Sequence, residues 1–75
     1  TNIDIYPNPA DNYLKINSNN VIREINIFSI DGRMIYYNNV SQNETTIDLT
    51  TFNKGTYIVR VILDEEVVVR KIVRT

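Results

Sequence analysis

Apolar and polar residues alternate with a period of two through most of this chain. Seven short runs carry the alternation, and no window of the sequence shows the period of an amphipathic helix, about 3.6 residues. The runs are separated by segments rich in Asn, Asp, Gly, Pro and Ser, which favour turns. We therefore expect strands at residues 3–6, 13–17, 22–30, 33–37, 45–49, 56–63 and 67–74.

Strands separated by turns every roughly eight to twelve residues predict two packed antiparallel sheets. The expected fold is all-β: a seven-stranded immunoglobulin-like antiparallel β-sandwich with Greek-key topology. Its 75 residues would form one domain, without an internal repeat or linker. The register of residues 67–73 stays open, because both faces of that run are mixed. The predicted core consists of Ile3, Ile5, Leu14, Ile16, Ile25, Ile27, Ile47, Leu49, Tyr57, Val59 and Val61.

Two turn signals are specific enough to place strand ends. Asp31-Gly32 lies between two apolar runs and is one of the strongest two-residue hairpin signals. Gly55 is placed to take a positive φ where the chain enters its next strand. Tyr57 then stands where a tyrosine corner would bury the ring and bond the hydroxyl to the preceding backbone. We interpret these four residues as structural.

The composition excludes several kinds of chemistry. Without His or Cys, the chain has no imidazole base, thiol nucleophile, disulfide or zinc ligand of the usual kinds. Eight basic and nine acidic residues are dispersed and give a net charge of −1, so we expect no nucleic-acid partner. A domain this thin should also lack the cleft that paired catalytic carboxylates require. We therefore expect no enzyme, no metal or other cofactor and no small-molecule substrate.

Four segments carry a resemblance that covers nearly the whole chain. They occur in the order and spacing seen in the type A C-terminal sorting domain of the bacterial type IX secretion system, also called the Por secretion system. Each segment alone is common, but four in order are specific. The segments are Ile5-Tyr6-Pro7-Asn8-Pro9-Ala10, Ile30-Asp31-Gly32-Arg33, Asn53-Lys54-Gly55-Thr56-Tyr57-Ile58-Val59 and Arg70-Lys71-Ile72-Val73-Arg74.

The resemblance implies a transport signal that is itself a folded domain, at the C-terminus of a larger passenger protein from a Bacteroidetes-type bacterium. In that family the passenger enters the periplasm by a signal peptide, and the sorting domain directs it through an outer-membrane translocon. A shuttle protein and a gingipain-like signal peptidase, acting as a sortase, are the further partners implied. Cleavage would lie upstream of Thr1, and the passenger would reach the cell surface or the medium. The turn Asp64-Glu65-Glu66 departs from the family, whose members often have a glycine there.

Two motifs are candidates for recognition by the secretion machinery. Residues 6–10 could end an edge strand, dock on the translocon, or do both. Residues 71–74 would guard a sheet edge with two basic side chains, yet a terminal strand with free hydrogen-bonding groups is also a site for strand addition. The first motif consists of Tyr6, Pro7, Asn8, Pro9 and Ala10, and the second of Lys71, Ile72, Val73 and Arg74.

The main alternative is a fibronectin-like accessory β-sandwich module of a secreted enzyme, which binds carbohydrate or spaces domains. Tyr36 and Tyr37 are adjacent, so in a strand they point to opposite faces and only one can join an exposed aromatic platform. A cluster of coplanar exposed tyrosine rings would favour the accessory module. Scattered or buried rings would favour the sorting domain.

Overall fold

The computed structural model describes residues 2–75, and every regular element in them is a β-strand. The all-β, antiparallel prediction is confirmed. No helix long and apolar enough to cross a membrane occurs within residues 2–75. Thr1, the predicted start of the domain, lies outside the described residues. The strands are β1 (Ile3–Tyr6), β2 (Tyr13–Ser29), β3 (Met34–Asp48), β4 (Gly55–Leu63) and β5 (Val67–Arg74).

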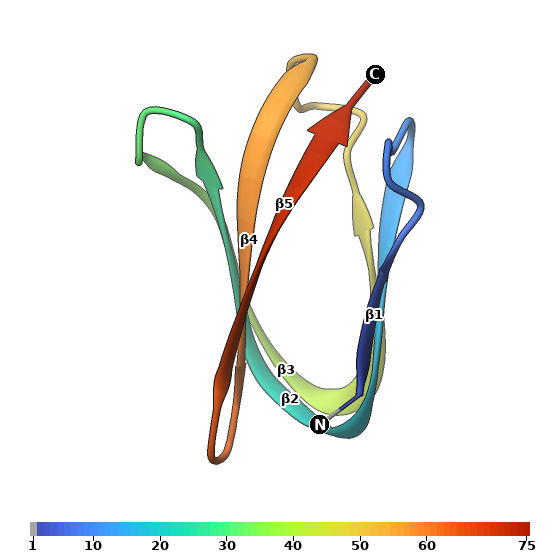
Figure 1. The fold of residues 1–75 in the computed structure, drawn as a ribbon, viewed down its shortest axis with the longest axis vertical. Coiled ribbons are helices and arrows are strands. Elements are labelled where there is room, and N and C mark those ends of the chain that lie inside the picture. Colours follow the sequence, from blue (N-terminus) through green and yellow to red (C-terminus); the bar gives the residue numbers. More distant parts are fainter. Residues whose placement is uncertain (1) are drawn as a thin grey trace.

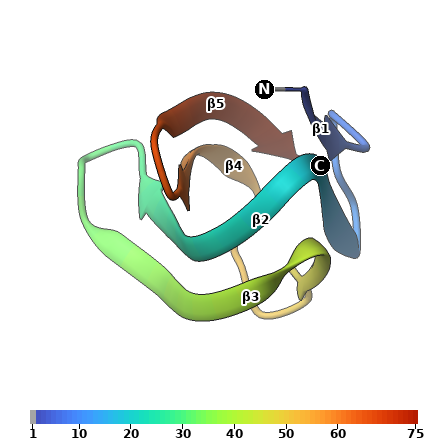
Figure 2. The same cartoon turned by 90° about the horizontal axis from the view of Figure 1, so that it is seen from below.

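β2 and β3 are long strands that bend together, and Figure 1 shows them curving as a U through the base of the molecule. β3 pairs with β2 along most of its length. The other edge of β2 pairs first with β1 and then with β4, and β4 pairs with β5. One curled sheet therefore supplies two facing layers, as the view from below in Figure 2 makes clear.

The predicted number of strands is wrong, because two segments that were predicted to separate strands are continuous strand. Residues 18–20 lie inside β2, where the pairing with β3 shifts register between Asn17 and Ile22, and residues 38–44 lie inside β3. Ser18 holds this bend: its Oγ accepts the Asn20 N–H at 3.0 Å, and its carbonyl accepts Asn43 Nδ2 at 3.4 Å. Polar side chains that favour turns here stabilise a bulged bend instead. With five strands in one sheet, the immunoglobulin-like Greek-key topology is not confirmed.

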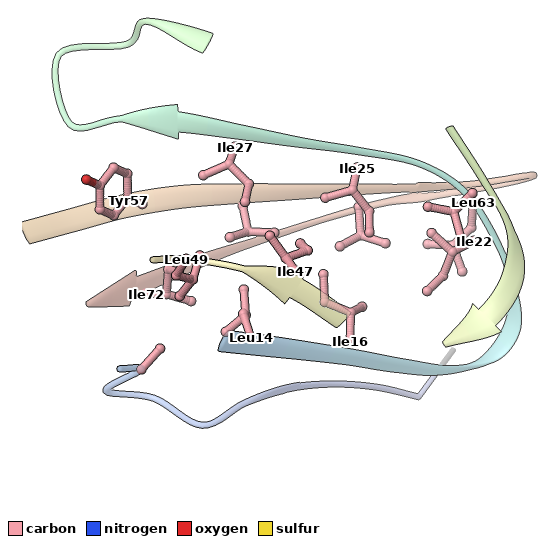
Figure 3. Packing of buried hydrophobic residues seen from close by; sticks show 14 residues of the cluster. Leu14, Ile16, Ile22, Ile25, Ile27, Ile47, Leu49, Tyr57, Leu63 and Ile72 are labelled. Atoms are coloured by element: carbon pink, nitrogen blue, oxygen red, sulfur yellow. The ribbon is translucent and has the colours of Figure 1, made fainter. Parts of the chain in front are cut away.

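The core fills the space between the two layers. Figure 3 shows Leu14 and Ile16 of one layer pointing toward Ile25 and Ile27 of the other. The predicted core residues are buried, except that Ile3 and Ile5 are only partly buried and pack against the cluster. The cluster also contains residues that the prediction missed, namely Ala10, Ile22, Val40, Leu63 and Ile72. The burial of Ile72 settles the register of β5, whose even-numbered residues Val68 and Ile72 face the core.

The predicted tyrosine corner is confirmed. The Tyr57 hydroxyl donates to the Asn53 carbonyl at 2.5 Å, and the ring is 7% exposed. Phe52 packs edge-on against this ring, with 5.5 Å between ring centroids. Gly55, which lies between Phe52 and Tyr57 in the sequence, has a φ of +147°. Residues that carry a side chain rarely adopt this backbone angle. The corner fixes where β4 starts and anchors it in the core.

The Asp31-Gly32 hairpin is also present, but its loop has one residue more than the predicted two-residue turn. The Ser29 N–H donates to the Arg33 carbonyl at 2.9 Å, and the Gly32 N–H donates to the Ser29 carbonyl at 2.9 Å. Gly32 has a φ of +91°. This is the pattern of a three-residue loop, in which a turn is followed by a glycine that forms a bulge. The Ser29 hydroxyl donates to the Asp31 carboxylate, which is the main reason why the pKa of Asp31 lies below its ordinary value.

Candidate functional site

The two candidate recognition motifs lie side by side. Ala10 and Arg74 form a parallel bridge outside the regular strands. The Ala10 N–H donates to the Val73 carbonyl at 2.7 Å, and the Ala10 carbonyl accepts the Thr75 N–H at 2.8 Å. We call this contact between residues 8–10 and 71–75 the seam. Figure 1 places it at the mouth of the U, where the end of β5 comes beside the segment that follows β1.

Asn8 extends the seam with its side chain. Its Nδ2 donates to the Lys71 carbonyl at 3.2 Å, and its Oδ1 accepts the Val73 N–H at 3.1 Å. The flanking Pro7 and Pro9 have no N–H to give, and both of their peptide bonds are cis. The side-chain amide of Asn8 therefore takes the place of a neighbouring strand at these positions of β5.

Strand addition at residues 71–74 is consequently not available to a partner. The outward N–H and C=O of Val73 are already bonded to Asn8 and Ala10, and the outward carbonyl of Lys71 is bonded to Asn8. The chain itself occupies this part of the β5 edge. What the seam offers to a partner is its exposed side chains.

The structure divides the predicted recognition residues into accessible and buried ones. Ala10 is fully buried and Ile72 is 1% exposed, so neither can contact a partner, and both belong to the core. The pattern could not reveal this for Ala10, because its burial depends on the pairing with β5. Pro7 and Arg74 are half-buried, whereas the accessible residues are Tyr6, Asn8, Pro9, Lys71 and Val73.

Lys71 and Arg74 do not form one basic patch, since residues three apart in a strand point to opposite faces. Lys71 is exposed on the outer face. Arg74 points inward at the mouth of the U, and its Nε is buried without a hydrogen-bond partner among residues 2–75. The pKa of Asp48 is lowered mainly by the bonds that the Thr50 hydroxyl and N–H donate to its carboxylate, and Arg74 contributes a smaller effect.

A buried polar cluster on the outer face of β2 and β4 was not predicted. Asn26 is fully buried, and its Oδ1 accepts Arg60 Nε at 3.0 Å and Nη2 at 2.7 Å. The Arg60 guanidinium lies 5.0 Å from the centroid of the Phe28 ring, and Asn26 Nδ2 donates to Glu24 at 3.2 Å. Only the pairing of Asn26 with Arg60 across the sheet reveals this cluster. Its hydrogen bonds are satisfied internally, so we interpret it as structural.

The tyrosines do not form a single platform. Tyr36 is half-buried and packs against Phe52, with 6.3 Å between ring centroids, while Tyr37 is 54% exposed. The Tyr37 hydroxyl donates to Glu24, which raises the pKa of this tyrosine. Tyr6 and Tyr13, the other two exposed tyrosines of residues 2–75, lie in the opposite layer. The rings are scattered, as expected for the sorting domain.

The acidic turn between β4 and β5 borders a surface hollow of about 550 Å³, lined by residues 20–21 and 63–66. Asp64 is tied to Arg23 on β2, whose Nε lies 2.7 Å from Asp64 Oδ1 and whose Nη2 donates to Oδ2 at 3.1 Å. These charge-assisted bonds hold the pKa of the Asp64 carboxyl below its usual range. The turn Asp64-Glu65-Glu66, which departs from the family, is thus held to β2 by the ion pair between Asp64 and Arg23.

Comparison with known proteins places this architecture in a family. A family model described as the secretion system C-terminal sorting domain matches residues 4–75. No curated protein sequence matches the chain. Among solved structures, the chain is similar to part of PorZ, an essential surface component of the type IX secretion system of Porphyromonas gingivalis. The TM-score is 0.78 at 16% sequence identity, over 97% of this chain and 11% of the PorZ chain, so this likeness shows the fold alone. Because the family match spans all four sequence segments, the chain belongs to the type IX secretion C-terminal sorting domains.

Proposed function

We propose that residues 1–75 are a folded C-terminal signal that directs a passenger protein from the periplasm through the outer-membrane translocon of the type IX secretion system. Membership of the sorting-domain family supports this role. The observation that carries it is the seam, in which Asn8 and Ala10 of the first motif bond directly to Lys71, Val73 and Thr75.

The seam explains physically why the signal would have to be folded before the secretion machinery recognises it. Residues 8 and 73 are far apart in sequence, and they lie together only when both layers of the curled sheet have formed. A receptor that contacts Lys71 and Val73 together with Tyr6 or Pro9 reads both ends of the domain at once. An unfolded or truncated domain would not present that surface.

The remaining steps of the proposal follow the family. The passenger precedes this domain, a shuttle protein and the translocon are its partners, and a gingipain-like signal peptidase acting as a sortase cleaves upstream of Thr1. The passenger then reaches the cell surface or the medium. We propose no catalytic role for the domain itself, because its role in sorting requires only binding.

Export of a foreign cargo tests the proposal. A folded reporter with its own periplasmic signal peptide is joined to residues 1–75 through their natural upstream linker and expressed in a bacterium that has a type IX system. The reporter should reach the surface or medium of this host, and it should stay in the periplasm of the same host when the translocon is inactivated. Periplasmic retention in both hosts, while an established sorting domain exports the same reporter, would contradict the proposal.

The scattered tyrosine rings argue against the carbohydrate-binding form of the accessory-module alternative. Carbohydrate binding by a β-sandwich module of that kind would need exposed rings on one surface, and Tyr37 lies in the other layer from Tyr6 and Tyr13. An accessory module would be distinguished from a sorting domain by binding of the isolated domain to an insoluble polysaccharide in a manner that depends on Tyr37.

A further inference from the structure

The seam covers only part of the free edge of β5. Alternate residues of an edge strand direct their N–H and C=O groups outward, and Val73 directs both of its groups to the seam. The pairing of β4 with β5 runs without a register shift, so Val67 and Val69 direct their groups to the same edge. β5 ends the strand order of the described sheet, and within residues 2–75 the hydrogen bonds that the structure shows for residues 8–10 join them to residues 71–75. The edge at residues 67–70 is therefore open.

The side chains along this open edge are apolar and exposed. Val67 is 54% exposed and Val69 is 52% exposed, both on the outer face of β5. Exposed edge strands usually carry charge or proline at such positions, which prevents unwanted pairing. Here the charged residues stand at the two ends of the open segment, with Glu65 and Glu66 before Val67 and with Arg70 and Lys71 at its C-terminal end. Two exposed valines beside backbone groups that no neighbouring strand pairs are the arrangement that strand addition uses.

The basic residues at the C-terminal end of the open edge indicate the chemistry of the part of the occupant that would lie beside them. Arg70 and Lys71 are both exposed, and within residues 2–75 the ion pair that the structure shows joins Arg23 to Asp64 instead. Arg70 Nη1 donates only to the neighbouring Val69 carbonyl, at 3.1 Å. Adjacent residues of a strand point to opposite faces, so two neighbouring acidic side chains of an added strand, one on each face, would meet Arg70 and Lys71, and the one beside Arg70 would release that carbonyl for pairing.

We propose that the edge of β5 at residues 67–70 receives a short extended segment of a component of the secretion machinery by strand addition. The segment carries apolar residues beside Val67 and Val69 and, on opposite faces, one acidic residue beside Arg70 and one beside Lys71. This inference rests on the proposed sorting function. It moves the strand-addition site from residues 71–74, which the seam closes, to the neighbouring residues that remain open.

A proline at position 69 tests the pairing. Because the Val69 N–H faces away from β4, Val69→Pro removes an outward donor while the β4–β5 ladder keeps its bonds. Val69→Thr is the matched control, since it keeps the N–H and the β-branched shape. In the reporter export assay, Val69→Pro should reduce export about tenfold, and Val69→Thr should export like the wild type.

The outcomes separate this inference from the proposed function. If the wild type is exported and a folded Val69→Pro domain is exported equally well, strand addition is overturned. If the wild type itself is not exported, the sorting function is overturned, and this inference with it. If Val69→Pro melts at a lower temperature than the control, Val67→Pro provides the same test one outward position earlier.

Two further arms test the occupant. Arg70→Glu should reduce export about tenfold while Arg70→Lys retains it, and equal export of the two would overturn the acidic segment. Sedimentation of the isolated domain should show a monomer. A dimer that Val69→Pro dissociates would show instead that a second copy of this chain occupies the edge, and would overturn the proposal.

Discussion

Asn8 acts as a strand partner of Val73, because its side-chain Oδ1 accepts the Val73 N–H at 3.1 Å across 65 residues of sequence. The same amide donates to the Lys71 carbonyl, so one side chain satisfies two consecutive outward groups of β5. At the mouth of the curled sheet, Ala10 continues this pairing through its bridge to Arg74. The first and last motifs of the chain thus form one structural unit.

Asn8→Ala should lower the free energy of unfolding by about 1–2 kcal/mol, because it removes two hydrogen bonds from an exposed site. Asn38→Ala is a suitable control, since Asn38 is also an exposed Asn and lies on the edge strand β3. Chemical denaturation of both variants provides the measurement. Equal stability of the two variants would mean that the side chain of Asn8 does not hold the seam in solution.

Asparagine should be tolerated at position 32 far better than at position 55. An added Cβ meets no atom within 4 Å at either glycine, so the cost of substitution comes from the backbone alone. Gly32 has a φ of +91°, near the left-handed region that Asn adopts, whereas the +147° of Gly55 lies well outside it. We expect Gly55→Asn to cost about 1–3 kcal/mol. Thermal melts that give Gly32→Asn the larger loss would contradict the geometry of the Tyr57 corner.

Tyr57→Phe tests the corner itself. The substitution keeps the packing of the ring against Phe52 and leaves the Asn53 carbonyl without its donor, at an expected cost of about 1–2 kcal/mol. Tyr13→Phe, at an exposed tyrosine of the other layer, should change the unfolding free energy by less than about 0.5 kcal/mol. A Tyr57→Phe domain as stable as the Tyr13→Phe domain would show that the hydroxyl contributes nothing.

Period-two alternation predicted the class of the fold and most of the core, because a sheet with one face inward buries every second residue. The alternation pattern did not predict the strands correctly where β2 and β3 bend. Ser18, Asn19 and Asn20 have the composition of a turn, and contacts with a distant segment keep them extended: Ser18 pairs with Ile3 of β1, and the Asn19 N–H donates to the Asn2 carbonyl at 3.2 Å. Counting strands from such segments splits two long strands into four.

The two motifs of the candidate site could be predicted from the sequence, but the contact between them could not. The sequence predicts residues 6–10 and 71–74 as two separate candidates for recognition, and nothing in either stretch shows that they bond to each other. Ala10 illustrates the reason: its burial and its hydrogen bonds depend on a partner more than 60 residues away. A contact between the two ends of a chain leaves no periodic signal in the sequence.

Stability should fall in acid and stay flat near neutrality. The carboxyls of Asp31, Asp48 and Asp64 have pKa values below their ordinary ones, each chiefly because of side-chain hydrogen bonds. Their ionised forms therefore favour the folded state, and this contribution is complete above the ordinary Asp pKa of about 4 and is lost as the pH falls through the lowered values.

Without histidine, no side chain has an ordinary pKa between about 5 and 8, so melting temperatures should be constant over that range and drop below a pH of about 4. Asp64→Asn should lessen the drop, since it removes one of the three groups. A melting temperature that rises on acidification would contradict these assignments.

The most direct test of the account is the location of a cargo fused to the wild-type domain or to two charge-reversed variants. Lys71→Glu changes an exposed side chain at the seam, and Arg33→Glu changes an exposed one in the β2–β3 loop. Surface charge changes usually shift stability by less than about 0.5 kcal/mol, so both variants should fold normally. Arg74 is left unchanged because its reversal would place a half-buried carboxylate near Asp48.

We predict that the wild type and Arg33→Glu carry the cargo outside the outer membrane, while Lys71→Glu leaves it in the periplasm. Export of all three alike would contradict recognition at the seam, and retention of all three would contradict the sorting function.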